Sequence, residues 1–332
     1  MREMGKRYFA VVGLLITLVL VLGACTPEAD SDSVDKGTPM YYWLYTNELF
    51  TKQQIVGKIV DPFMEDAVDY LIINWNHVFD ALELPIKIIL NALQKFMVET
   101  VPWPVMLIAV FALGYASGGW RLAWLVFGLL LVEGILGYWD LAMSTVAMII
   151  TAVSMSTLFG VPLGILASRN DRFAAILRPI LDGMQTIHPF VYLVPIVMFF
   201  GIGKVPGTMA TMVYAIPPIV RLTNLGIRQV SKEVVEASIS FGATDRQTLF
   251  EVQLPLAMPT IMAGLNQTLM MALAMVVIVA MIAGGGLGSE IIRGVNRLEV
   301  GRAVRSGLAV LILAVVLDRL SQARAKSPNQ DD

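Results

Sequence analysis

The sequence predicts an all-α protein that crosses a membrane several times. Hydrophobic residues make up 56% of the 332 residues and charged residues only 15%, whereas soluble domains carry about 25% charged residues. Several apolar runs approach the length of about 20 residues that a transmembrane helix needs. They are too long and unbroken for the alternating strands of a membrane barrel, and open sheet edges cannot lie in lipid. We therefore expect a polytopic helical bundle.

Composition also excludes several classes of function. The formal net charge is −2, so no basic bias points to a nucleic-acid partner. The single cysteine rules out an internal disulfide and multi-cysteine metal sites, and the two histidines are far apart. We expect no metal site, no bound cofactor and no nucleic acid.

The first 25 residues are typical of a secretory signal. A basic start precedes an apolar run at 8–22, and 22–25 read Leu-Gly-Ala-Cys. This tetrapeptide resembles a lipobox, in which Cys25 would be lipidated; the alternative is an uncleaved signal anchor. Either way the following residues are exported, and the acidic, aperiodic stretch at 26–40 is expected to be a flexible linker.

Residues 41–102 form an exported tail with helical periodicity. Apolar residues recur at steps of three and four, which predicts amphipathic helices lying along the outer membrane surface. A small exported helical pair packed on itself is the alternative. The later apolar set consists of Phe79, Leu82, Ile86, Ile89, Leu90, Leu93 and Phe96.

The transmembrane domain is expected over 103–320, with a short tail at 321–332. Loops rich in Lys and Arg follow the third, fifth and seventh spans, and parity places all three on one side, which is the cytoplasm. The loop at 284–302 disagrees, because its arginines fall outside and its glutamates offset them only partly; the glycines at 284–288 suggest a flexible turn or an outer gate hinge. The seven predicted spans are 103–117, 121–138, 141–167, 187–201, 205–221, 257–283 and 303–320.

The predicted loop at 222–255 is long and has an amphipathic pattern of its own. Connections in compact bundles are much shorter, so we interpret this loop as a docking element. Apolar positions precede Gly242, which interrupts the pattern, and Asp245 can cap a second short helix. The loop therefore predicts a helix, a break and another helix.

The same loop resembles the EAA signature of ABC importer permeases. Glu236-Ala237-Ser238 is followed after three residues by Gly242, and after nine more by Val252, Gln253, Leu254 and Pro255. The family pattern has alanine at position 238 and isoleucine at position 252. The resemblance implies that this loop couples the chain to a cytoplasmic ATPase, with Pro255 ending the docking element and Glu236 contacting either the partner or a neighbouring loop. The implied coupling residues are Glu236, Ala237, Ser238, Gly242, Val252, Leu254 and Pro255.

Further segments look like the permease subunit of glycine betaine/proline betaine importers, and this likeness extends over roughly 70–325. It implies a MetI-like type I importer fold and a homodimer with two ATP-binding subunits and an exported solute-binding protein. The implied cargo is glycine betaine, proline betaine or choline. The segments are 190–195, 200–203, 217–222, 253–267 and 312–320.

The chain is not expected to be an enzyme. It contains no G-x-x-x-x-G-K-[ST] loop, so a partner chain would use ATP and Mg²⁺. One rival interpretation is a permease for another small solute, such as carnitine or an amino acid. The second rival is an ATPase-independent secondary transporter, which would keep its activity after replacement of Gly242 or Glu236.

Five polar or aromatic residues are candidates for the pathway or a gate. Glu133 lies inside a predicted span, where a carboxylate is expensive and usually marks a pathway or a partner. Asn266 and Gln267 either line the pathway or hydrogen-bond to neighbouring helices. Phe190 and Tyr192 belong to an aromatic set that could surround a quaternary ammonium group or face lipid.

Overall fold

The structure is a computed structural model that describes residues 70, 74, 77–282 and 284–325. Every regular element in this part of the chain is a helix, and none of its residues lies in a strand. This confirms the predicted all-α class. The predicted signal with Cys25, the linker at 26–40 and the end of the tail at 326–332 lie outside the described residues.

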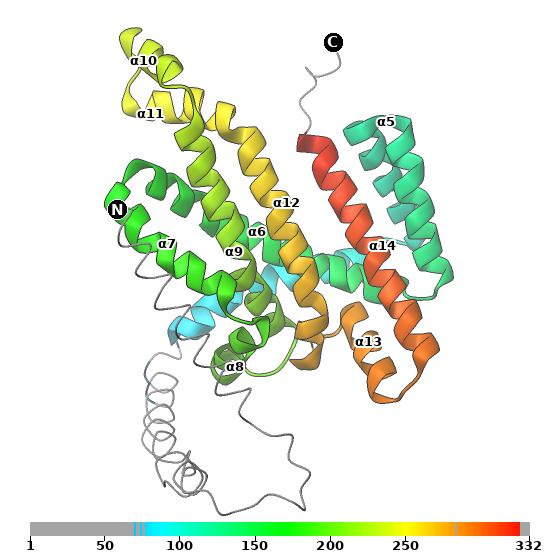
Figure 1. Ribbon diagram of the computed structural model, residues 1–332. Helices are drawn as coiled ribbons and strands as arrows, with labels where there is room; N and C mark the ends of the chain where they lie inside the picture. Colours follow the sequence, from blue (N-terminus) through cyan, green and yellow to red (C-terminus); the bar gives the residue numbers. More distant parts are fainter. Residues whose placement is uncertain (1–69, 71–73, 75–76, 283, 326–332) are drawn as a thin grey trace, which may run out of the picture. The chain divides into compact units, whose positions relative to one another are not determined.

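Helices follow one another with short connections (Figure 1). A helical stretch at 77–94 leads into the first of them. In chain order they are η1 (Lys95–Thr100), α5 (Trp103–Ile135), α6 (Trp139–Arg169), α7 (Asp171–Thr186), α8 (Pro189–Phe200), α9 (Lys204–Gln229), α10 (Lys232–Ser240), α11 (Asp245–Gln247), η2 (Thr248–Gln253), α12 (Leu254–Val279), η3 (Ala280–Ile282), α13 (Gly286–Asn296) and α14 (Val300–Ala325).

Helix α9 makes its most extensive contacts with α6 and α12, and these three helices form the centre of the bundle. Glycines let their backbones approach closely. A Cβ built on Gly164 would lie 2.8 Å from the carbonyl oxygen of Val220, and one built on Gly160 would lie 2.4 Å from Cγ2 of Ile219. Close approach is how membrane helices gain contact energy, because lipid supplies no hydrophobic drive for their association.

Helix α5 is a hairpin of two arms. The backbone leaves helical dihedrals at Gly119, where φ is 75°, and a Cβ built on Gly114 would lie 3.1 Å from Cα of Ala123. In a straight helix these two residues would be about 13.5 Å apart along the axis. The chain therefore folds back on itself, as the two teal segments in Figure 1 show. The predicted spans 103–117 and 121–138 correspond to the two arms.

By length and composition alone, four described helical runs could cross a membrane: α5, counted as one run in spite of its reversal at Gly119, α6, the continuous helix Asp245–Ile282, and α14. A fifth span is reached if α7 and α8, which are bent by 100° at the break between them, count as one. The predicted number of seven is therefore not confirmed. The span expected at 187–201 is α8, whose 12 residues are too few to cross alone. The span expected at 205–221 is part of α9, which carries polar residues such as Thr208 and Thr211.

Helix α7 occupies a segment that hydropathy assigns to a cytoplasmic loop. Ala174 and Leu181 are buried on one face, whereas Arg172 is exposed on the other. Such an amphipathic helix has too many charges to stand out in a search for long apolar runs. Asn170 begins it, because its side-chain oxygen accepts the backbone N–H of Arg172 at 3.0 Å.

Helix α13 occupies the glycine-rich segment that is predicted to be a flexible turn or hinge. Gly286 and Gly288 belong to its first turn. The backbone N–H of Leu287 donates to Oγ1 of Thr145 in α6 at 2.9 Å, and Leu287 is fully buried. The glycines therefore permit close packing of α13 on its neighbours, since a Cβ on Gly286 would lie 2.4 Å from the same Thr145 oxygen.

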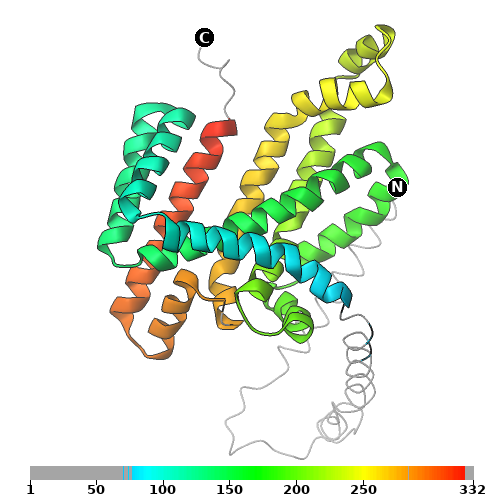
Figure 2. The same ribbon diagram turned by 180° about the vertical axis from the view of Figure 1, so that it is seen from behind.

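The helical stretch at 77–94 crosses the bundle, as Figure 2 shows. Ile86 and Leu90 are 3% and 0% exposed and belong to clusters with residues of α6, α8 and α9. Phe79 stacks on Phe199 of α8 with 4.7 Å between ring centroids. The apolar stripe therefore faces the bundle, whereas its amphipathic pattern alone suggests a position along the membrane surface.

Candidate functional site

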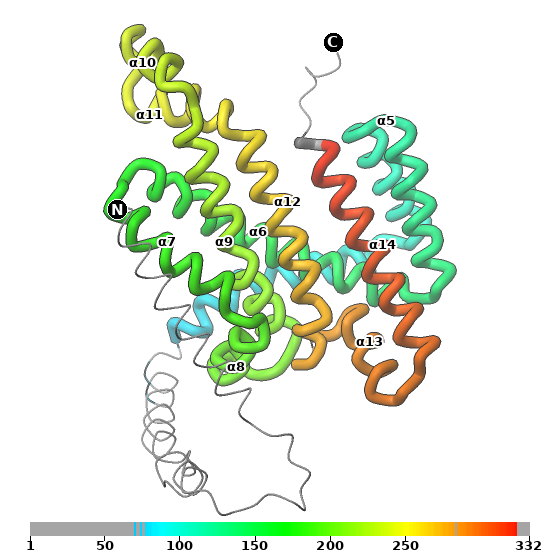
Figure 3. Tube along the Cα trace, viewed as in Figure 1, coloured from blue at the N-terminus to red at the C-terminus, as the bar shows by residue number. Residues whose placement is uncertain are grey.

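The segment between α9 and α12 projects beyond the other helices, as the tube in Figure 3 shows. It is shorter than the predicted loop at 222–255, because α9 continues to Gln229 and helical structure resumes at Asp245. Gly226 does not break α9, since it packs against α12: a Cβ on it would lie 3.2 Å from the carbonyl oxygen of Ala257. Helix α10 is the main element that remains between the two long helices.

The predicted break at Gly242 is present, and it has a clear local cause. Gly242 adopts φ +88°, a left-handed conformation that costs other residues about 1–2 kcal/mol. The second helix is capped by Thr244 and not by Asp245 as predicted: Thr244 Oγ1 accepts the backbone N–H of Gln247, while the Gln247 side chain accepts the backbone N–H of Thr244 at 2.9 Å. This reciprocal capping box defines where the chain turns back.

The inner face of α10 is polar and contacts the rest of the chain. Ser238 Oγ lies 3.2 Å from Oγ1 of the buried Thr248. A cavity of about 260 Å³ beneath α10 is lined by Glu236 together with Arg169, Arg228 and Lys232. Glu236 is exposed beside these basic residues, so its contact with a partner or with a neighbouring loop stays a prediction.

Helix α10 and the turn that follows it expose several apolar side chains. Val234 is 42% exposed, Ile239 53% and Phe241, directly after the helix, 92%. Ala237 is exposed on the same short helix and leaves room for an approaching surface. Exposed apolar side chains gathered in this way mark an interaction site more often than an inert surface. The sequence pattern does not show the high exposure of Phe241, because that exposure depends on the turn at Gly242.

Val252, Leu254 and Pro255 lie where α10 and α11 join the bundle. Val252 is in η2, and the N–H of Leu254 donates to the carbonyl of Leu249, which is the i to i−5 pattern of a π-helix. Pro255, which has no N–H, is accommodated in the first turn of α12. Helix α12 begins beside Pro255, although the helical run is continuous from Asp245 to Ile282, and the expectation that Pro255 ends the docking element stays a prediction.

Ion pairs tie the projecting segment to α6 and α7. Arg228 of α9 lies 2.7 Å from an Asp171 carboxylate oxygen and donates to the carbonyl of Ala167 at 2.8 Å. Arg169 at the end of α6 lies 3.9 Å from the carboxylate of Asp245. Exposed pairs each contribute only about 0–1 kcal/mol, but together they restrict how the segment can tilt.

The candidate pathway residues lie on separate helices. Glu133 of α5 is fully buried, and both of its carboxylate oxygens lack a hydrogen-bond partner among the described residues. Asn266 of α12 is half-buried with an unpartnered Oδ1, whereas the adjacent Gln267 is exposed. Helix α5 packs mainly on α14, whereas α12 packs mainly on α9. Glu133 and Asn266 therefore lie on helices with different main neighbours.

The two aromatic candidates on α8 also differ in their surroundings. Phe190 is 41% exposed and stacks on the His188 ring at 5.3 Å. Tyr192 is half-buried, donates its hydroxyl to the carbonyl of Met184, and meets Tyr214 edge-on at 5.9 Å between centroids. Tyr192 therefore braces α8 against α7 and α9, whereas Phe190 faces outward.

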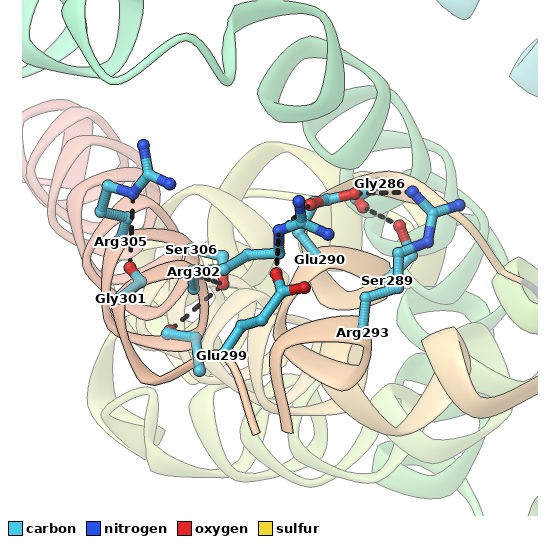
Figure 4. Close-up of polar contacts among 10 residues, drawn as sticks. Gly286, Ser289, Glu290, Arg293, Glu299, Gly301, Arg302, Arg305 and Ser306 are labelled. Carbon is cyan, nitrogen blue, oxygen red and sulfur yellow. Dashed lines mark hydrogen bonds and ion pairs between the residues drawn. The ribbon is translucent and has the colours of Figure 1, made fainter. Parts of the chain in front are cut away.

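A charged cluster joins α13 to α14 at the end opposite α10 (Figure 4). Glu290 is 9% exposed, and its carboxylate lies 2.7 Å from Arg293 and 3.8 Å from Arg302. Arg302 also lies 3.0 Å from Glu299. The cluster explains how the arginines of 284–302 are partly neutralised. The position of Glu290 between two helices is not visible from sequence.

Comparison with known proteins identifies the family. Residues 160–326 match the family described as binding-protein-dependent transport system inner membrane component. The chain is 48% identical over 264 residues to the glycine betaine/proline betaine transport system permease protein ProW of Escherichia coli (strain K12), over 80% of this chain and 74% of the relative. The chain belongs to the binding-protein-dependent permease family.

A second permease supports this assignment, and a solved structure is reported beside it. The chain is 42% identical to the glycine betaine transport system permease protein OpuAB of Bacillus subtilis (strain 168), over 80% of this chain and 93% of the relative. A solved structure of inward-facing conformations of the MetNI methionine ABC transporter has 25% identity and a TM-score of 0.47, over 55% of this chain and 89% of that one. As a family member, the chain is a multi-pass inner-membrane transport component, and the family works with ATPase and solute-binding partners in general.

Proposed function

We propose that this chain is the permease of an ATP-driven importer for a compatible solute: glycine betaine, proline betaine or choline. The printed names of the relatives support this solute class, because ProW and OpuAB are described as glycine betaine permeases. Carnitine remains the nearest rival, since the relative GbuB of Listeria monocytogenes, 44% identical, is a glycine betaine/carnitine permease.

The observation that carries the ATP-driven mechanism is the set of exposed apolar side chains on α10 and in the turn after it. Its most exposed side chain, Phe241 at 92%, has no role in the packing of this chain and is suited to insertion into a groove on a partner. Ser238 and Gly242 instead set the position of α10, through the contact with Thr248 and the left-handed turn, and Val252, Leu254 and Pro255 join it to α12. Glu236 is exposed on α10 and would contact the ATP-binding subunit or a neighbouring loop. Two copies of the chain would each present one such set of side chains to one of two ATP-binding subunits.

The long helices supply the mechanical link. A displacement of α10 would be transmitted by α9 and by the continuous helix Asp245–Ile282, which are tied to α6 and α7 through Arg228 and Arg169. Rigid-body motion of this kind is a common form of domain switching. In this proposal the α10 end is cytoplasmic, the N-terminal tail is exported, and the α13 end receives the solute-binding protein.

ATP and Mg²⁺ would act only on the partner subunits, and this chain would bind neither. The pathway itself is proposed to pass Asn266, with Tyr192 bracing α8, and Phe190 is a weaker candidate because it faces outward. Gln267 is a weaker candidate for the pathway than Asn266 because of its exposure, and Glu133 is better placed for contacts at the α5–α14 packing.

Transport by the reconstituted complex tests the solute class. Proteoliposomes containing the permease, its ATPase and its binding protein should accumulate radiolabelled glycine betaine when ATP is enclosed. Unlabelled proline betaine or choline should compete, whereas an amino acid without a quaternary ammonium group should not. Accumulation of the amino acid in preference to glycine betaine would contradict the proposed solute class while leaving the ATP-driven mechanism intact.

A further inference from the structure

A second cavity lies between α6, α7 and α9 and has a different character from the one beneath α10. Its volume is about 340 Å³. The apolar part of its wall consists of Leu177 and Leu181 of α7 and Val220 and Leu225 of α9, together with two alanines. An apolar wall of this size can cover the beginning of a hydrocarbon chain.

The rim of this cavity is basic. Arg178, Arg221 and Arg228 line it, and Asp182 is the only carboxylate among the lining residues. Arg221 pairs with Asp182, and Arg228 pairs with Asp171 outside the lining. Arg178 forms no ion pair or side-chain hydrogen bond within the described part of the chain. The cavity therefore has an excess of positive charge and one guanidinium group that is free to bind a ligand.

The helices around the cavity expose apolar side chains as well as its charged rim. Leu225, which lines it, is 44% exposed, and α7 exposes Ile176 at 65% and Ile180 at 53% on its far side. Exposed isoleucine and leucine on helices of a membrane protein indicate contact with lipid. A ligand could therefore enter the cavity from the membrane.

The lining also discriminates among ligand classes. None of the described residues that line the cavity is aromatic, so a quaternary ammonium group would find no cation–π partner. Guanidinium groups instead match the oxygens of a phosphate bidentately. Basic pockets between membrane helices are known to bind anionic lipid headgroups.

We propose that this cavity binds the phosphodiester headgroup of an anionic phospholipid, with Arg178 on the phosphate and the upper acyl chain along Leu177, Leu181 and Leu225. Free inorganic phosphate shares the headgroup chemistry but not the acyl contact. The assignment of the lipid to the cytoplasmic leaflet rests on the proposed function, because that side is defined by α10; the cavity and its charges do not depend on it.

Lipid retention by the purified full-length chain tests this proposal. The chain is extracted from nanodiscs of phosphatidylglycerol or of phosphatidylcholine, and bound lipid is counted by native mass spectrometry. We expect retention of phosphatidylglycerol and not of phosphatidylcholine, and a loss of about tenfold in Arg178→Gln, since a charge-assisted bidentate contact is removed. Arg172→Gln is the matched control, because it removes the same charge from an exposed position on the same helix outside the cavity.

Two further arms separate the lipid from a free anion. Leu225→Gln should lower retention of phosphatidylglycerol but leave unchanged the protection against thermal unfolding that inorganic phosphate gives. The same melting experiment confirms that each variant is folded. Equal losses in Arg178→Gln and Arg172→Gln would overturn the site. Displacement of all bound lipid by inorganic phosphate, with no effect of Leu225→Gln, would overturn the lipid assignment. None of these outcomes involves solute or ATPase, so they are independent of the proposed transport function.

Discussion

Replacement of Phe241 by alanine tests the docking role of α10 with a perturbation that should not disturb the fold. The side chain is 92% exposed, so its removal leaves no cavity and should change the stability of the free permease by less than about 0.5 kcal/mol. If a partner groove buries the ring, the complex loses about 1.5–3 kcal/mol of apolar burial. This corresponds to a dissociation constant raised roughly 10- to 150-fold.

The assay is a titration of the purified ATPase subunit onto the permease in nanodiscs, followed by biolayer interferometry. Leu298→Ala is the matched control, because Leu298 is 87% exposed but follows α13 at the opposite end of the bundle. We expect the affinity to fall in Phe241→Ala and to stay unchanged in Leu298→Ala. A dissociation constant within twofold of the unmodified chain in Phe241→Ala would refute the assignment of this face.

Three further substitutions address the packing and the turn. Gly164→Ala should lower the melting temperature by an amount corresponding to about 1–3 kcal/mol, because its Cβ meets a backbone carbonyl, whereas Gly128→Ala, with nothing within 4 Å, should not; equal effects would contradict the close packing. Glu290→Gln should cost about 1 kcal/mol by removing the carboxylate charge that faces Arg293 and Arg302, and more than Glu299→Gln at a more exposed position; the reverse order in thermal melting would be evidence against the cluster. Gly242→Ala should cost about 1–2 kcal/mol in the turn and speed amide exchange in α10 without moving the main melting transition, and unchanged exchange would show that the turn is not strained.

Local chemistry made the helix, turn and second helix between α9 and α12 predictable. A glycine between two amphipathic stretches specifies a left-handed turn, and the structure has it at Gly242 with φ +88°. The identity of the cap was less certain, since Thr244 and Asp245 are both good capping residues and only the reciprocal bond to Gln247 decides between them. The protrusion of Phe241 follows from the turn geometry, which sequence periodicity does not contain.

Most features that the sequence did not predict depend on how the helices pack against one another. Hydropathy recognises lipid-facing helices, so it overlooks the partly charged α7, and the separate spans that it assigns at α8 and α9 are not confirmed by the length and composition of those helices. It also cannot show that the stretch containing Ile86 and Leu90 faces protein, because the same amphipathic pattern suits a membrane surface. The pairing of Glu290 with Arg302 joins two helices, and such contacts depend on how the helices are placed.

Uptake of labelled glycine betaine into proteoliposomes is the most direct test of the central claim that this permease is driven by an ATPase bound at α10. The account predicts accumulation that requires enclosed ATP and the ATPase subunit, and that falls in Phe241→Ala at limiting ATPase concentration. Accumulation driven by an ion gradient in vesicles that contain this chain alone would contradict it.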